Sequence, residues 1–288
     1  MSHHQLIKRR TVPEIIARKG KEKLVCLTAY TAVMATLLEP HCDMLHVGDS
    51  VGMVMHGMPS TVGVTIDMMI MHAQAVMRGS SSALVTVDLP FGSFENSPDQ
   101  AFRTASRMVA ATGCQAVKVE AIEGIGPIIS FLVGRGIPVM GHIGIRPQSV
   151  NVAGGFKALG RNEAERQQVL AEARCVDSAG AFAMVVEGVT PELALEVTEA
   201  VKCPTIGIGG SADCDGQVLV TEDMLGLFER TARFVRRYAD MRAIVSEAAS
   251  AYARDVRSGS FPSDKETYTF KSPLDASISA DQPGSSGA

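Results

Sequence analysis

Leu84-Val85-Thr86-Val87-Asp88 is a short apolar run that ends on a carboxylate, directly before Leu89-Pro90. Five further runs stop in a similar way on a polar residue near glycine, proline or serine, and they begin at Met44, Ala116, Pro138, Met184 and Thr205. Such brief runs, rich in valine, isoleucine and leucine without strict alternation, are typical of parallel strands buried on both faces. The chain is therefore predicted to form a parallel sheet with polar residues gathered at the strand ends.

Strand-like and helix-like segments alternate along the chain, which is the pattern of repeated βα units. Seven strands are predicted, beginning at Leu24, Met44, Leu84, Ala116, Pro138, Met184 and Thr205, with a weaker eighth at Gln217–Val220. Helices are expected after the capping residues Thr11, Ser97, Asn162 and Thr190. An α/β fold that closes into a (β/α)₈ TIM barrel is favoured over a doubly wound open sheet, because no glycine fingerprint follows the first strand.

The 288 residues are expected to contain one barrel domain over residues 11–270, with a short N-terminal helix and with C-terminal helices. Helical periodicity over Leu225–Tyr252 predicts a helix that could pack against a neighbouring subunit. Residues 1–10 are expected to be a flexible N-terminus. Residues 271–288, rich in serine, proline and glycine, are expected to be a disordered tail.

Composition narrows the classes of partner. A net charge of -4 and the absence of tryptophan argue against binding to nucleic acid or to an anionic membrane. No stretch approaches the roughly 20 uninterrupted apolar residues that span a bilayer, so a soluble protein is expected. The six cysteines form no CxxC pair, which fits a reducing, cytoplasmic location.

Asp49, Asp88 and Glu120 each follow an apolar strand directly. The strand ends of a barrel open onto one face, so these carboxylates are expected to converge, and unpaired they would repel one another. Mg²⁺ held by oxygen ligands removes that repulsion and leaves positions for water or substrate. For any one of them a strand-end cap or a salt bridge to a loop arginine is the commoner role, but three in register favour the metal.

Three further polar residues belong to the same strand ends. Lys118 is expected to hold a substrate carboxylate or a developing enolate. A structural ion pair with Glu120, two residues along the strand, is nearly as well supported by the spacing. His142, between two glycines, is by itself more typical of a hydrogen-bonded core histidine than of a catalyst. Glu187 closes an apolar run, and desolvation suits it to be a general base, with a buried ion pair as the alternative.

With these residues aligned, the chain resembles the ketopantoate hydroxymethyltransferase family over about residues 11–270. The motifs that carry the resemblance are Leu27-Thr28-Ala29-Tyr30, Val47-Gly48-Asp49-Ser50, Asp88-Leu89-Pro90-Phe91, Val117-Lys118-Val119-Glu120, Gly141-His142-Ile143-Gly144-Ile145, Pro147-Gln148-Ser149, Gly154-Gly155-Phe156-Lys157 and Asp215-Gly216-Gln217. Taken in order, they are highly specific.

The resemblance implies a barrel of the phosphoenolpyruvate/pyruvate type, assembled as a homo-oligomer that is decameric in the bacterial enzymes. It also implies the first committed step of pantothenate and coenzyme A biosynthesis. In that step a hydroxymethyl group passes from 5,10-methylenetetrahydrofolate to 3-methyl-2-oxobutanoate through a magnesium-stabilised enolate.

The family's site residues carry over by position to this sequence. Asp49, Asp88 and Glu120 match the Mg²⁺ site. The 2-oxoacid contacts fall on Asp49, Ser50, Asp88 and Lys118, and Glu187 matches the proton acceptor. His142 is expected to orient the substrate or a water molecule.

Three positions depart from the family's usual pattern: Thr31, Gly210-Ser211-Ala212 and Glu222. None falls on the expected metal or base residues, so they bear on loop geometry and folate contacts. Two other readings stay open. One is a magnesium-dependent lyase or mutase of the same barrel type, although no convincing cysteine-bearing loop is present. The other is a non-catalytic relative that binds a 2-oxoacid, against which the complete set of acids argues.

Overall fold

The structure is a computed structural model that describes residues 9–155 and 157–268. The chain divides into two units, Met1–Ala239 and Asp240–Ala288. The first unit contains every strand, and the second contains one long helix. The expected disordered tail, residues 271–288, and most of the expected flexible N-terminus lie outside the described residues.

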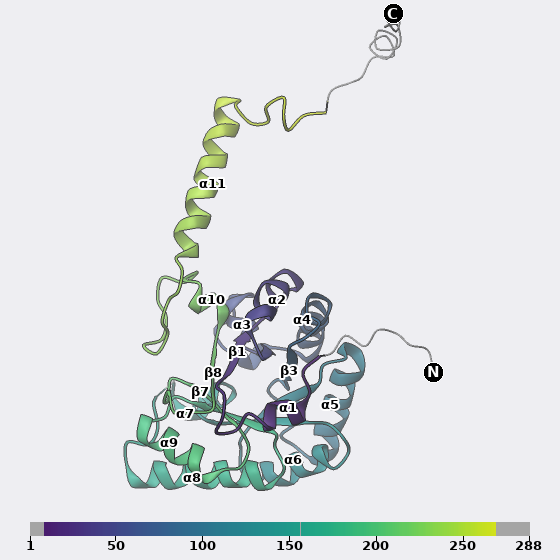
Figure 1. The fold of residues 1–288 in the computed structure, drawn as a ribbon, viewed down its shortest axis with the longest axis vertical. Helices are drawn as coiled ribbons and strands as arrows, with labels where there is room; N and C mark the ends of the chain where they lie inside the picture. The colour runs from purple at the N-terminus through teal and green to yellow at the C-terminus, as the bar shows by residue number, and fades with distance from the viewer. Residues whose placement is uncertain (1–8, 156, 269–288) are drawn as a thin grey trace, which may run out of the picture. The chain divides into compact units, whose positions relative to one another are not determined.

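Eight parallel strands close into a barrel in chain order, which confirms the predicted fold (Figure 1). They are β1 (Leu24–Thr28), β2 (Met44–Val47), β3 (Leu84–Asp88), β4 (Ala116–Glu120), β5 (Val139–Gly144), β6 (Ala183–Glu187), β7 (Thr205–Ile208) and β8 (Gly216–Leu219). The weakly predicted β8 pairs with both β7 and β1, so it closes the ring.

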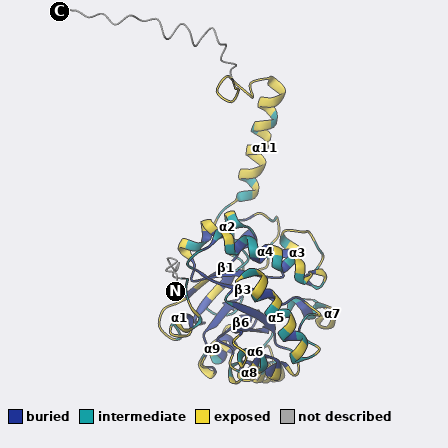
Figure 2. Ribbon diagram, turned by 90° about the vertical axis from the view of Figure 1, so that its right-hand side faces the viewer, coloured by how far each residue is buried: buried dark blue, intermediate teal, exposed yellow. Residues whose placement is uncertain are grey.

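Helices connect the strands and surround the barrel, with their exposed faces turned outward (Figure 2). The α-helices are α1 (Val12–Ile16), α2 (Ala32–Leu38), α3 (Val51–Val54), α4 (Ile66–Gly79), α5 (Pro98–Thr112), α6 (Ile125–Val133), α7 (Val150–Ala153), α8 (Glu163–Ser178), α9 (Pro191–Ala200) and α10 (Thr221–Met224). Short 3₁₀ turns are η1 (Glu39–His41), η2 (Thr61–Gly63) and η3 (Pro147–Ser149). Ser97 and Asn162 form the expected caps, because they accept hydrogen bonds from Gln100 N and Glu165 N, whereas Thr190 precedes α9 without a side-chain cap bond.

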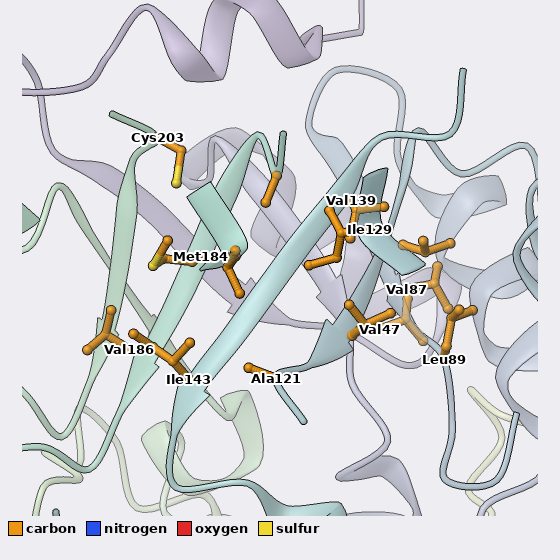
Figure 3. Packing of buried hydrophobic residues seen from close by; sticks show 14 of the residues in the cluster. Val47, Val87, Leu89, Ala121, Ile129, Val139, Ile143, Met184, Val186 and Cys203 are labelled. Carbon is orange, nitrogen blue, oxygen red and sulfur yellow. The ribbon is translucent and has the colours of Figure 1, made fainter. Parts of the chain in front are cut away.

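Alternation along each strand produces two apolar cores. Outward-facing residues such as Val87, Val139 and Val186 pack beneath the helices (Figure 3). Inward-facing residues, among them Met44 and Leu84, fill the barrel. Further along β3 and β4 the inward positions become polar, so the apolar filling forms a floor beneath a polar layer at the carboxyl ends.

The second unit contains α11 (Met241–Ser258), which begins where Asp240 Oδ1 accepts a hydrogen bond from Ala243 N at 3.1 Å. The prediction of a helix over Leu225–Tyr252 was therefore wrong in its first half. Gly226, with φ +73°, ends the turn after α10, and Tyr238 N donates to Met224 O at 2.8 Å. Apolar spacing alone does not reveal such a looped segment.

No helix within the described ranges is both long and apolar enough to cross a bilayer.

Candidate active site

All seven predicted site residues line one cavity of about 140 Å³ at the carboxyl ends of the strands: Asp49, Ser50, Asp88, Lys118, Glu120, His142 and Glu187. Strand register brings them together, because Asp88 of β3 is aligned with Lys118 of β4, and Glu120 is aligned with His142 of β5. Residues aligned on adjacent parallel strands are near neighbours. The cavity is therefore a direct product of the barrel's register.

Asp88 is the best-partnered acid of the site. Its Oδ1 lies 2.7 Å from Lys118 Nζ and 3.3 Å from His46 Nε2, and its Oδ2 accepts a hydrogen bond from Asp49 N at 3.0 Å. Burial alone would raise the pKa of Asp88, but Lys118 and His46 outweigh it and hold that pKa well below its usual range. Asp88 is thus a carboxylate, and its partner is Lys118. The alternative pairing of Lys118 with Glu120 is not the one that forms.

Asp49 and Glu120 form no salt bridge with a lysine or arginine among the described residues, and their pKa values are raised. Burial, with a smaller repulsion from Asp88, raises the pKa of Asp49 to about 7. Burial and the charge of Asp49 raise the pKa of Glu120 to about 8. Gln148 holds both acids, since its Nε2 donates to Asp49 Oδ2 at 2.8 Å and its backbone N donates to Glu120 Oε1 at 3.1 Å. An added cation would therefore be stabilised here.

The chemistry of Asp49, Asp88 and Glu120 fits a hard divalent cation, because all donors are carboxylate oxygens. Glu120 Oε2 is buried and has no hydrogen-bond partner among the described residues. Their present arrangement is less complete: within the described part of the chain, no three acidic, histidine or cysteine side chains surround a common metal position. Lys118 and Gln148 occupy oxygens that a metal would use, so binding requires side-chain rotation.

His142 links the lysine to the open acid. Its Nδ1 lies 3.2 Å from Lys118 Nζ, and its Nε2 lies 3.1 Å from Glu187 Oε2, although that contact falls short of regular hydrogen-bond geometry. Burial and the charge of Lys118 lower the pKa of His142, so the ring is neutral. An ammonium group only donates, which makes Nδ1 the acceptor and places the ring proton on Nε2, facing Glu187.

Glu187 ends β6 and is the more open of these acids, with 17% of its side chain exposed against 2% for Glu120. The apolar run before it places Val185 on the cavity wall beside it. A carboxylate that reaches the cavity while an N–H faces it can accept a proton from a bound molecule.

Ser50 precedes α3 but does not cap it with its side chain. Its Oγ instead lies 2.8 Å from the hydroxyl of Tyr30, and it faces the cavity. Gly48 allows this arrangement, because a Cβ there would lie 2.9 Å from Ser50 Oγ and 3.4 Å from His46 Nε2. The short turn Gly48-Asp49-Ser50 therefore presents two site residues within three positions.

Sequence reasoning did not single out His46, Gln148 or Tyr30. All three are buried and bind the predicted residues directly. A weak signal existed for each, since His46 is the polar residue of an apolar strand and the other two lie within the quoted motifs. Their partners depend on spatial neighbours, which the sequence does not supply.

The departures from the family pattern are accommodated locally. Thr31 caps α2, and its Oγ1 accepts from Met34 N at 3.2 Å, a role that aspartate also performs. Ser211 Oγ bonds Asp213 within its own turn. Glu222 is buried, and burial with the nearby charge of Asp223 raises its pKa to about 7.

Fold and cavity together define a barrel enzyme with an acidic site at the carboxyl ends of its strands. The chain belongs to the ketopantoate hydroxymethyltransferase family, whose sequence model matches residues 9–264. It is 59% identical over 271 residues to the 3-methyl-2-oxobutanoate hydroxymethyltransferase of Hyphomonas neptunium, with 94% of this chain and 98% of that relative covered. The protein of the same description from Maricaulis maris is 60% identical over 264 residues, covering 92% of this chain and 95% of the relative.

Solved structures support the fold. A phosphonopyruvate hydrolase in complex with oxalate and Mg²⁺ has a TM-score of 0.58 at 15% identity, covering 89% of this chain and 93% of its own. A 2,3-dimethylmalate lyase of the PEP mutase/isocitrate lyase superfamily has a TM-score of 0.57 at 17% identity, covering 94% and 97%. These likenesses show that the chain shares their barrel fold.

Proposed function

We propose that the chain transfers a hydroxymethyl group from 5,10-methylenetetrahydrofolate to 3-methyl-2-oxobutanoate, giving 2-dehydropantoate. The observation that carries the proposal is one cavity holding two kinds of acid. Asp49, Asp88 and Glu120 form a buried set of carboxyl groups, and Glu187 stands apart with an N–H of His142 facing it. Family membership and the names of the relatives support the same reaction.

Asp49, Asp88 and Glu120 would hold Mg²⁺, which when bound supplies positive charge to the keto and carboxylate oxygens of the oxoacid. Lys118 keeps its positive charge, because Asp88 and Asp49 raise its pKa despite the opposing effect of burial. It therefore faces the cavity as a fixed cation for the negative charge that develops. Ser50 supplies a neutral hydroxyl to the substrate carboxylate.

Glu187 accepts the C3 proton of the oxoacid, and the electron pair left behind moves toward the C2 oxygen. His142 faces that acid with the N–H of its neutral ring, 3.1 Å from Glu187 Oε2. The C3 carbon then forms a bond to the methylene carbon of the folate. The bonds from that carbon to two folate nitrogens are replaced by this bond and by one to a hydroxyl from water, so that tetrahydrofolate leaves.

A homo-oligomeric assembly and a cytoplasmic location belong to the same proposal, because family membership supports both. Light scattering of the purified full chain tests the first, with a monomeric mass as the contradicting result.

Proton exchange at C3 tests the chemistry without folate. With the protein, Mg²⁺ and 3-methyl-2-oxobutanoate in D₂O, we expect the C3–H signal in the NMR spectrum to disappear. EDTA should abolish the exchange, and Glu187→Gln should slow it about 10²- to 10⁴-fold, whereas the exposed Glu192→Gln should not. Exchange that persists in both tests contradicts the mechanism. Binding of the oxoacid without exchange identifies a non-catalytic relative.

A further inference from the structure

Three side chains and one backbone amide form a chain of polar contacts that ends at the cavity. Tyr30 is 1% exposed, and its hydroxyl lies 2.8 Å from Ser50 Oγ. The side chain of Thr28 interacts with the same hydroxyl and acts to lower its pKa. Thr28 Oγ1 in turn accepts a hydrogen bond from the backbone N of Thr221 at 3.0 Å.

The direction of this chain is fixed at its far end. A backbone N–H only donates, so Thr28 Oγ1 is an acceptor toward Thr221 and its own proton is free to go to Tyr30. Burial raises the pKa of Tyr30 far above its usual value, so its hydroxyl stays protonated and is able to donate to Ser50 Oγ. With Tyr30 as the donor, the remaining proton of Ser50 points away from Tyr30.

Ser50 lines the cavity and does not cap α3, although serine at this position commonly does. Thr28 is also held by Thr221 Oγ1, which donates to Thr28 O at 2.5 Å, so the donor end is fixed on both sides. We propose that Tyr30 and Thr28 are positioning residues that direct the Ser50 hydroxyl proton into the cavity, toward the carboxylate of the bound oxoacid. This inference rests on the proposed function for the identity of that anion.

A double-mutant cycle between Tyr30 and Ser50 tests the inference. Calorimetry with 3-methyl-2-oxobutanoate and Mg²⁺ gives the dissociation constant, and C3–H exchange in D₂O gives kcat and KM for the same proteins. We expect Tyr30→Phe to weaken binding and raise KM about three- to tenfold, the effect of one hydrogen bond, with kcat nearly unchanged. Ser50→Ala should do at least as much, and the double variant should do no more than Ser50→Ala alone.

Matched variants separate positioning from general packing. Thr28→Ser keeps the hydroxyl and should bind as the unmodified chain does, whereas Thr28→Val should resemble Tyr30→Phe. Tyr238→Phe, at a tyrosine that is 67% exposed, should change nothing.

The outcomes distinguish the two proposals. Equal effects of Tyr30→Phe in the presence and absence of Ser50 overturn the positioning role, and so does an unchanged dissociation constant in Tyr30→Phe. A chain that binds the oxoacid but exchanges no proton overturns the proposed reaction, while the binding cycle still decides the role of Tyr30.

Discussion

His142 Nε2 lies 3.1 Å from Glu187 Oε2, so a buried neutral ring directs its N–H toward an acid that is open to the cavity. The same ring accepts from Lys118 on its other nitrogen. Lysine, histidine and glutamate therefore lie in contact across β4, β5 and β6, and the proposed base is coupled to the cation proposed to bind the substrate.

Replacing His142 should impair proton abstraction more than binding. His142→Leu keeps much of the apolar volume but removes both nitrogens, and we expect kcat for C3–H exchange to fall about 10- to 100-fold with KM within about twofold. His142→Gln offers both a donor and an acceptor, so it should recover part of the rate. NMR exchange measurements check this, and a change confined to KM would contradict the assigned role.

Gly48→Ala should disturb the site through Ser50. The added Cβ would lie 2.9 Å from Ser50 Oγ, closer than such atoms approach, so the hydroxyl must move. We expect binding of the oxoacid to weaken about threefold to tenfold, as for the loss of one hydrogen bond. Gly63→Ala is the control, because its Cβ would meet only Met58 Sδ at an ordinary 3.7 Å. Equal affinity of both variants in calorimetry would argue against the tight fit at Gly48.

Asp215 should make stability depend on pH. Burial alone would raise its pKa, but hydrogen bonds from Lys19 Nζ, Thr205 N and Gly20 N lower it. Because the folded-state pKa lies below the unfolded value of about 4, the stabilisation is present above that pH and is lost as pH falls through the folded pKa.

Asp215→Asn should thus lower the free energy of unfolding by about 1–3 kcal/mol near neutral pH, and the difference should shrink in acid. Urea unfolding at both conditions measures it, with the exposed neighbour Asp213→Asn as the control. A difference that is independent of pH would show that the charge of Asp215 is not what stabilises this contact.

Alanine substitutions at two adjacent isoleucines test how much packing inside the barrel contributes to stability. Ile15 is 1% exposed and packs with the interior filling, whereas Ile16 is 43% exposed. Ile15→Ala should cost about 2–4 kcal/mol of unfolding free energy, and Ile16→Ala should cost well under half of that. Comparable losses of unfolding free energy in the two variants would contradict the packing of Ile15 with the barrel interior.

The sequence predicted the barrel and seven of the residues that line the cavity, because parallel strands have a recognisable composition and their ends share one face. It did not predict that Lys118 pairs with Asp88. Residues two apart on a strand are separated by roughly 6.6 Å, whereas neighbouring strands lie about 4.8 Å apart. Lys118 therefore pairs with Asp88 on the adjacent strand and not with Glu120 on its own strand. That neighbour depends on register, which no single strand encodes. The loop at 225–240 was missed for a related reason, since apolar spacing does not show where a chain reverses.

Apolar side chains, Ile15 among them, fill the barrel interior beneath the polar layer that lines the cavity. We therefore expect reactants and products to enter and leave through the same opening, at the carboxyl ends of the strands. A small keto acid seated at the bottom would have to arrive before a bulky pterin and depart after it, so steady-state kinetics should show an ordered sequence of binding and release.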